Sequence, residues 1–241
     1  PTRAHALLFL QRVAPTKLVD GAWLQGLTPL WRDSRLHTLL RTYLDELGRG
    51  QPTQNHVVLY RHLMQRHEID LPEYLPDALF TQGLVQLALG HHGPACLPEL
   101  VGFNLGYEQL PLHLLITAHE LNELGIDPYY FTLHVTVDNA ATGHARQALD
   151  SIAALWPDWQ QDPLLWQRIR HGHALNQFGL GSTAVVRGLD LRAANARLET
   201  AGADERGAWG LDAFRPRIAL SSSFGAQSAA PIARMVFDYY L

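Results

Sequence analysis

The chain has 241 residues, 47% of them hydrophobic and 17% charged, which is enough to build one well-packed domain. Its formal net charge of -4 at pH 7 gives no reason to expect binding to nucleic acid or to an anionic membrane surface. The single cysteine, Cys96, excludes an internal disulfide and a zinc knuckle built from paired thiolates.

Helices are predicted along most of the chain, because apolar residues recur mainly at spacings of three and four. The first clear amphipathic helix spans 34–47 and ends at the glycine- and proline-containing segment 48–54. A second helix is expected from about Thr53, and a third over 74–89. The short break predicts that the first two of these helices form an antiparallel hairpin.

Two long helices are predicted in the middle of the chain. The first covers 98–124 and is expected to bend near Pro111, because an internal proline removes a backbone hydrogen bond. The second covers about 128–156, and Gly125 provides the stop between them. We expect the two helices to lie antiparallel.

The last part of the chain predicts helices at 158–178 and 184–200, a loop-rich segment at 201–228 and a final helix at 229–241. No P-loop, dinucleotide fingerprint, internal repeat or β-rich half is evident. The sequence therefore predicts an all-α fold, a single helical-bundle domain over 1–241 with about seven to nine helices.

Targeting segments are not evident either. No apolar run approaches the roughly 18 residues of a membrane-spanning helix, and no charged-then-apolar leader precedes a cleavage site. We therefore expect a cytoplasmic protein without membrane contact. The start at Pro1 leaves open whether the sequence is a piece of a longer protein.

Carboxylates and imidazoles occur within the two long apolar segments, where burying a charge without a partner is costly. His134 and Asp138 are four residues apart, so on a helix their Cβ atoms lie about 5–6 Å apart on one face. They could bind one metal ion or two adjacent ions. The alternative is an ordinary hydrogen bond between a histidine and a carboxylate.

Glu46 and His56 form a second candidate pair. Each lies five positions from a break centred near Gln51, so the two side chains should face each other across the hairpin. A glutamate and a histidine arriving from two helices make a natural half-site for iron. The alternative places Glu46 in solvent and His56 at a helix start.

Glu108 is the third element. It lies eleven residues before His119, close to three helical turns, so both should face the same side of one helix. The antiparallel return of the chain would bring Glu108 beside the later part of the helix that carries His134. Glu99 and Glu120 remain competitors for this central carboxylate, although Glu99 is half a turn out of phase with Glu108.

Two histidines and three carboxylates from four helices suit a carboxylate-rich di-iron centre better than a structural zinc, which usually needs only four ligands. The predicted metal ligands are Glu46, His56, Glu108, His134 and Asp138. Further ligands or hydrogen-bond partners around them are sought among His119, Glu120 and His144. Of these, His144 is off the face of Asp138 and is expected outside the ligand set, beside the metal or facing substrate.

The segments LVGFNLGYEQLPLHLL and ELGIDPYYFTLHVTVDNAATGHA resemble the iron-containing redox enzymes of the haem-oxygenase-like fold, also called haem-oxygenase-like di-iron oxidases. The resemblance covers roughly 40–150, and the HxxxD block of His134 and Asp138 is its specific part. It implies a helical domain with two irons, an early Glu and His pair matched by Glu46 and His56, and a central carboxylate. Some members carry a further carboxylate from the first helix, for which Asp20 is a poor match.

For function, the resemblance implies two Fe(II) ions per chain that activate O2 to oxidise a small amino-acid- or fatty-acid-derived metabolite by N-oxygenation, desaturation or C–C cleavage. Aromatic residues that could line the substrate pocket are Tyr107, Tyr129, Tyr130 and Phe131. An external electron donor and a homodimer are compatible with such a fold, and no sequence feature identifies an interface.

The sequence also allows two other functions and disfavours a third. A haem-degrading enzyme of the same fold would need one proximal histidine, for which His5 and His37 are the candidates, and would leave the carboxylates without a role. A metal-free helical protein that binds a small molecule or a partner would use the buried pairs only as polar ties. A zinc-dependent hydrolase is disfavoured because no HExxH motif occurs.

Overall fold

The computed structural model describes residues 2–71, 75–109 and 112–190, and over these ranges the fold is all-α, as predicted. The 3-10 helices are η1 (Ala22–Leu30), η2 (Ser34–Leu36), η3 (Gly48–Gly50), η4 (Asp77–Leu79) and η5 (Leu175–Gln177). The α-helices are α1 (Arg3–Lys17), α2 (His37–Glu46), α3 (His56–Arg66), α4 (Thr81–His92), α5 (Leu97–Tyr107), α6 (Leu112–Glu123), α7 (Tyr129–Val137), α8 (His144–Trp159), α9 (Leu165–Ala174) and α10 (Ser182–Arg187).

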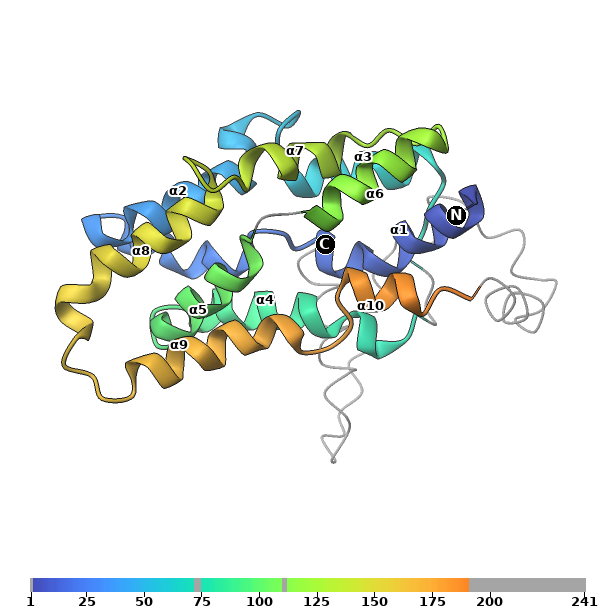
Figure 1. Cartoon of the computed structure of the whole chain (residues 1–241). Helices are drawn as coiled ribbons and strands as arrows, with labels where there is room; N and C mark the ends of the chain where they lie inside the picture. Colours follow the sequence, from blue (N-terminus) through green and yellow to red (C-terminus); the bar gives the residue numbers. More distant parts are fainter. Residues whose placement is uncertain (1, 72–74, 110–111, 191–241) are drawn as a thin grey trace, which may run out of the picture.

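The helices form an elongated bundle with two sides (Figure 1). Helices α3, α6 and α7 lie together on one side, α4, α5 and α9 lie on the other, and α1 lies between them. The tightest packing joins α5 to α9, α4 to η1, α6 to α7 and α2 to α8. This arrangement leaves the ends of α2, α5 and α7 and the starts of α3 and α8 pointing toward the middle of the bundle, where the candidate site lies.

The antiparallel hairpin expected for α2 and α3 was wrong, because α2 packs on α8 and η1, whereas α3 packs on α1 and α7. Both helices are also shorter than the pattern predicted. The turn uses backbone of positive φ at Gly48, Arg49 and Gly50, and a Cβ on Gly48 would collide with the backbone of Asn55. Asn55 then caps α3 by accepting a hydrogen bond from the backbone N–H of Val58 at 2.9 Å. A tight turn followed by a strong cap fixes where each helix meets the other.

Both long helices predicted for the middle of the chain are divided in two. The helix expected over 98–124 ends at Tyr107 and resumes at Leu112, because Pro111 cannot donate to the carbonyl four residues earlier. Glu108 and His119 therefore do not share one helix face, and that expectation was wrong.

The helix expected over 128–156 is interrupted between Val137 and His144. Asn139 causes the break, because its side-chain Oδ1 accepts hydrogen bonds from the backbone N–H groups of Ala141, Thr142 and Gly143 at 3.0, 2.9 and 3.2 Å. An asparagine that satisfies its own following backbone in this way competes with helix. The chain turns back and α8 begins beside the end of α7.

Other predicted boundaries also shift. The helix expected over 74–89 is α4, and the one expected over 158–178 is α9 followed by η5. Of the helix expected over 184–200, α10 covers only the start, and the predicted loop at 201–228 and helix at 229–241 lie outside the described residues.

Two apolar clusters make up the core. The first is built from α1, α3, α4, α6 and α7 and includes Leu10, Tyr60, Leu63, Leu121 and Tyr130. The second is built from η1, α2, α4, α5 and α8 and includes Trp23, Leu39, Leu100, Phe103 and Leu155. None of the described helices is long and apolar enough to cross a membrane. The buried ionisable groups of the next section come from elements of both clusters.

Candidate metal centre

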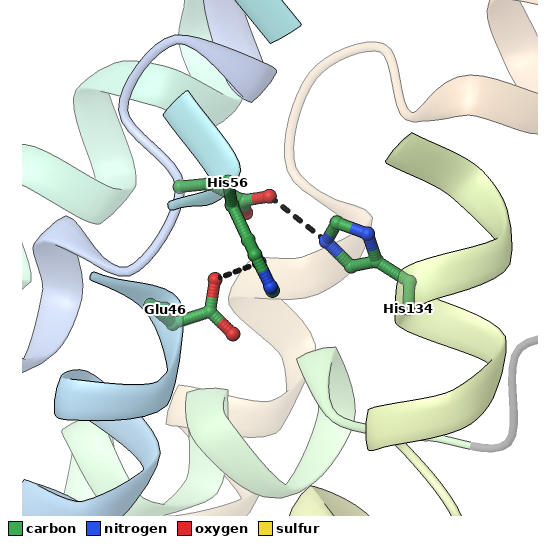
Figure 2. Close-up of side chains that lie close together, drawn as sticks. Glu46, His56 and His134 are labelled. Atoms are coloured by element: carbon green, nitrogen blue, oxygen red, sulfur yellow. Dashed lines mark hydrogen bonds and ion pairs between the residues drawn. The ribbon is translucent and has the colours of Figure 1, made fainter. Parts of the chain in front are cut away.

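Glu46 and His56 lie together as predicted, although they meet where the end of α2 approaches the start of α3 and not across a hairpin of packed helices. Glu46 is the last residue of α2 and His56 the first of α3, and both side chains are buried. The Oε2 atom of Glu46 lies 2.5 Å from Nδ1 of His56, without hydrogen-bond geometry (Figure 2). Figure 2 also shows His134 pointing toward this pair from α7.

His134 presents one ring nitrogen to the cluster and uses the other for the backbone. Its Nδ1 lies 2.8 Å from the carbonyl oxygen of Tyr130, which can only accept, so Nδ1 carries a proton. Its Nε2 lies 3.2 Å from Oδ2 of Asp20. A neutral imidazole would then place two lone pairs opposite each other, so a proton or a metal ion belongs between them. A backbone carbonyl that fixes the tautomer of a histidine in this way is typical of metal-ligating histidines.

Asp20 completes a first group of four. It lies between α1 and η1, and one potential ligand atom from each of Asp20, Glu46, His56 and His134 lies within 4.8 Å of the others. In the sequence, Asp20 was a poor match to the further carboxylate of the family's first helix. It lies near the start of the chain, and no short spacing relates it to the other ligands. Its one signal was its place as an acid in the apolar stretch LVDGAWL.

A second group shares one member with the first. Ligand atoms of Glu46, Glu108 and His144 also lie within 4.8 Å of one another. Nδ1 of His144 lies 3.3 Å from Oε2 of Glu108, 3.4 Å from Oε1 of Glu46 and 3.1 Å from Oδ1 of Asp138. All four side chains are buried. Three carboxylates thus surround one imidazole nitrogen.

His144 therefore lies inside the cluster, whereas the sequence had placed it outside the ligand set. The break at Asn139 is the reason, because an unbroken helix would have carried His144 off the face of Asp138. The outer nitrogen, Nε2, lies 3.5 Å from Oδ2 of Asp45, whose Oδ1 pairs with Nε of Arg49 at 2.5 Å. A carboxylate behind a histidine is the usual outer partner of a metal ligand.

The electrostatics of the cluster are unfavourable without a cation. Burial, with the neighbouring Asp20 charge, raises the pKa of Glu46 to about 8. Burial and Asp138 raise the pKa of Glu108 well above its ordinary value. Burial would lower the pKa of His144, but the nearby carboxylates of Asp138, Asp45 and Glu108 outweigh it and raise the pKa. Without a metal ion, the buried groups therefore favour their protonated forms, and the protons supply positive charge that a cation could supply instead.

The donor set is compatible with iron binding. Among the described residues, buried polar atoms without a hydrogen-bond partner gather here, namely Glu46 Oε2, His56 Nδ1, Glu108 Oε1, Asp138 Oδ1 and His144 Nε2. Native proteins leave few such atoms, and a cluster of them calls for an ion or water. Oxygen and imidazole ligands in this number suit iron better than a four-coordinate structural zinc.

The remaining candidates lie elsewhere. His119 and Glu120 are exposed on α6 and belong to neither group. Glu99 binds Arg168 through two hydrogen bonds of 2.7 Å. Of the acids considered for the central carboxylate, Glu108 is therefore the one that the structure brings to the cluster.

The histidines weighed for a haem have other partners. Nε2 of His37 lies 2.9 Å from the carbonyl oxygen of Trp31, and Nδ1 of His5 lies 2.8 Å from the hydroxyl of Thr2. His37 is exposed and His5 half-buried, and neither belongs to the two groups. The geometry thus defines a helical protein with a buried centre of carboxylates and histidines.

Comparison with known families agrees with this description. The sequence pattern of the iron-containing redox enzymes matches residues 7–177, which include every member of both groups. The chain belongs to this haem-oxygenase-like family of iron-containing redox enzymes.

Similarity to curated proteins is short. The chain is 60% identical over 43 residues to the phosphoadenosine 5'-phosphosulfate reductases of Xanthomonas campestris pv. campestris strains B100 and 8004. The shared stretch is 18% of this chain and 18% of each reductase, so it does not extend the reductase activity to this chain. No solved structure matches the chain.

Proposed function

We propose that the chain is a non-haem di-iron oxidase or oxygenase that uses O2 to oxidise a small metabolite. The observation that carries the proposal is the pair of buried ligand groups that share Glu46. One ion would be held by Asp20, Glu46, His56 and His134, and the other by Glu46, Glu108, Asp138 and His144. Glu46 would bridge the two ions.

Charge supports two divalent ions rather than one. The cluster holds four buried carboxylates, Asp20, Glu46, Glu108 and Asp138, together with three histidines. Two Fe(II) ions carry four positive charges, which match the four carboxylates, whereas one ion and the buried ammonium of Lys17 together carry three. A single ion would leave an uncompensated buried charge, which is strongly unfavourable.

Bound ferrous ions would supply the electrons that activate O2. The protein side chains hold the ions, fix the tautomers of His134 and His144, and keep water away. Tyr60 and Tyr130 pack as an edge-to-face pair on one side of the cluster, and Trp23 packs on Tyr107 on the other. A dry site of this kind strengthens every charge interaction within it.

A small substrate is supported by a pocket that abuts the cluster. The pocket has a volume of about 240 Å³ between α3 and α7, and its lining includes Leu59, Leu63, Arg66 and Tyr130. Tyr130 also touches the rings of His134 and His56, so one side chain separates the pocket from the proposed ions. At roughly 30 Å³ per water molecule, the pocket has room for about eight waters, or a compact metabolite.

The reaction within this class is a finer proposal. Family resemblance favours an amino-acid- or fatty-acid-derived substrate and an outcome such as N-oxygenation, desaturation or C–C cleavage. Of the predicted pocket aromatics, Tyr129 and Tyr130 line the pocket, whereas Phe131 packs against Phe9 in the core. An external electron donor, a homodimer and a cytoplasmic location remain part of the proposal.

The test is metal content after anaerobic loading with Fe(II). We expect about two irons per wild-type chain and a change in the optical spectrum on addition of O2. His134→Ala should lose iron and the spectral change, because its ring nitrogen lies within the first group. The matched control is His119→Ala, which removes an exposed histidine of α6 and should retain two irons.

Other outcomes decide against the proposal. Failure of the folded wild-type chain to take up iron would favour a metal-free binding protein. Tight binding of haem, with no uptake of free iron, would favour the haem-degrading alternative. Equal iron loss in both histidine variants would show that the ions do not occupy this cluster.

A further inference from the structure

Two tyrosine hydroxyls hold the carboxylate of Asp20 from either side. The hydroxyl of Tyr107 donates to Oδ1 at 2.9 Å, and the hydroxyl of Tyr130 donates to Oδ2 at 2.6 Å. Asp20 itself is 5% exposed. A carboxylate has about four lone-pair sites, so these two bonds leave it able to bind a cation on the side that faces His134.

The two tyrosines are fixed by separate parts of the core. Tyr107 ends α5, and its ring packs on Trp23 with a centroid distance of 4.6 Å. Tyr130 lies in α7, and its ring packs on Tyr60 at 4.7 Å. Because Tyr107 packs in the second apolar cluster and Tyr130 in the first, the two hydroxyls are set independently. Asp20 is therefore anchored between two rigid bodies of side chains.

A buried lysine accompanies this arrangement. Lys17 is 7% exposed, and its Nζ lies 3.5 Å from the hydroxyl oxygen of Tyr107. Its Nζ also lies 5.5 Å from the ring centre of Tyr107 and 5.8 Å from that of Tyr130. A cationic side chain thus lies beside one of the two hydroxyls that contact Asp20.

The second group has no comparable support. Its member Glu108 and the adjacent Asp138 are approached by His144, whose Nδ1 lies 3.3 and 3.1 Å from their oxygens. A metal ion would have to displace that contact, because Nδ1 of His144 is the nitrogen that faces both acids. The two halves of the centre are therefore unequal in how far they are prepared for an ion.

We propose that Tyr107 and Tyr130 are positioning residues that hold Asp20 as a ligand of only one of the two metal ions, the one shared by Glu46, His56 and His134. The inference rests on the proposed metal centre and adds the residues that shape one half of it. Loss of either hydroxyl should therefore lower the affinity for one metal ion and leave the affinity for the other unchanged.

Manganese(II) is a suitable probe, because the free ion is counted directly by its six-line EPR signal. We would titrate Mn(II) into wild type, Tyr107→Phe and Tyr130→Phe. Removing an outer hydrogen-bond partner of a ligand typically costs 10–100-fold in metal affinity. We expect a loss of about that size for one of the two ions, with the other changed less than about threefold. Asp20→Asn should lower the affinity for the same Mn(II) ion.

Tyr60→Phe is the matched control. Tyr60 is buried against Tyr130, but its hydroxyl donates to the carbonyl oxygen of Leu10 at 2.7 Å and not to Asp20. It should leave both Mn(II) affinities unchanged, even though it removes a buried hydrogen bond. Far-UV circular dichroism would verify that all the variants are folded.

Each other result has a definite meaning. Wild-type affinities for both ions in Tyr107→Phe and Tyr130→Phe would overturn the inference and leave the metal centre standing. Equal weakening of both ions, or the same loss in Tyr60→Phe, would show a general effect of packing and would also overturn it. Failure of wild type to bind two ions would instead reject the proposed metal centre itself.

Discussion

Replacing Glu46 by Gln should stabilise the metal-free protein and destabilise the metal-loaded one. Glu46 is 3% exposed and lies among other carboxylates, so its ionised form is disfavoured in the folded chain. Glutamine has nearly the same shape but no charge to bury. In the metal-loaded protein the same change would remove a carboxylate that belongs to both ligand groups and would leave one positive charge uncompensated.

The size of the effect follows from the pKa. Folding raises the pKa of Glu46 from 4.5 to about 8, so the folded state favours the protonated acid. The cost is absent below the unfolded pKa, grows as pH rises from 4.5 to about 8, and is constant above that. At pH 7, about 2.5 units above the unfolded value and 1.36 kcal/mol per unit, it is about 3 kcal/mol. Such a gain would raise the Tm by about 6–12 °C in a chain of this size.

The assay is urea unfolding at pH 4.5, 7 and 8.5, with and without bound Fe(II) under anaerobic conditions. Glu46→Gln should match wild type at pH 4.5 and exceed it at pH 7 when metal is absent. Glu99→Gln is the control of opposite sign, because Glu99 is paired with Arg168 and its pKa is lowered. A less stable metal-free Glu46→Gln at pH 7 would refute the reasoning, since the buried carboxylate of Glu46 would then contribute to folding.

Three further measurements are expected to give defined results. Asp45→Asn should lower the affinity for one Mn(II) ion by about 10-fold, because Oδ2 of Asp45 lies 3.5 Å from Nε2 of His144. Asp150→Asn, at a surface ion pair, should leave both Mn(II) affinities unchanged. Metal affinity should rise with pH between about 5 and 8, because metal displaces protons from acids of raised pKa; two-buffer calorimetry would detect the protons released, and their absence would contradict this. Gly172→Ala should cost about 1–3 kcal/mol in urea unfolding, since its Cβ would enter the backbone of α5, whereas Gly181→Ala, with open space around it, should not.

Local geometry explains what the sequence could predict. Glu46 and His56 flank one short turn, which brings the end of α2 to the start of α3. His134 and Asp138 are four residues apart at the end of α7, and both side chains are buried at the cluster. The first pair spans eleven residues and the second five, and whether these side chains ligate metal stays a prediction.

Long-range geometry explains the rest. Asp20 reaches the cluster because α1 is packed between the two sides of the bundle, which no spacing in the sequence encodes. His144 was placed outside because, on an unbroken helix, a residue six positions past Asp138 lies off the face of that carboxylate. The side chain of Asn139 decides that break by capturing three backbone N–H groups. A single residue thus determines which direction the following imidazole faces.

The two ligand groups also have a consequence for the chain as a polymer. Their members come from positions 20, 46, 56, 108 and 134 and from His144, so a bound pair of ions would close several loops at once across more than half of the sequence. Each closed loop lowers the entropy of the unfolded chain, as a covalent cross-link does. The chain has one cysteine and so no internal disulfide, and within its described residues the ions would link distant segments reversibly. Chelation would then destabilise the whole bundle rather than one site.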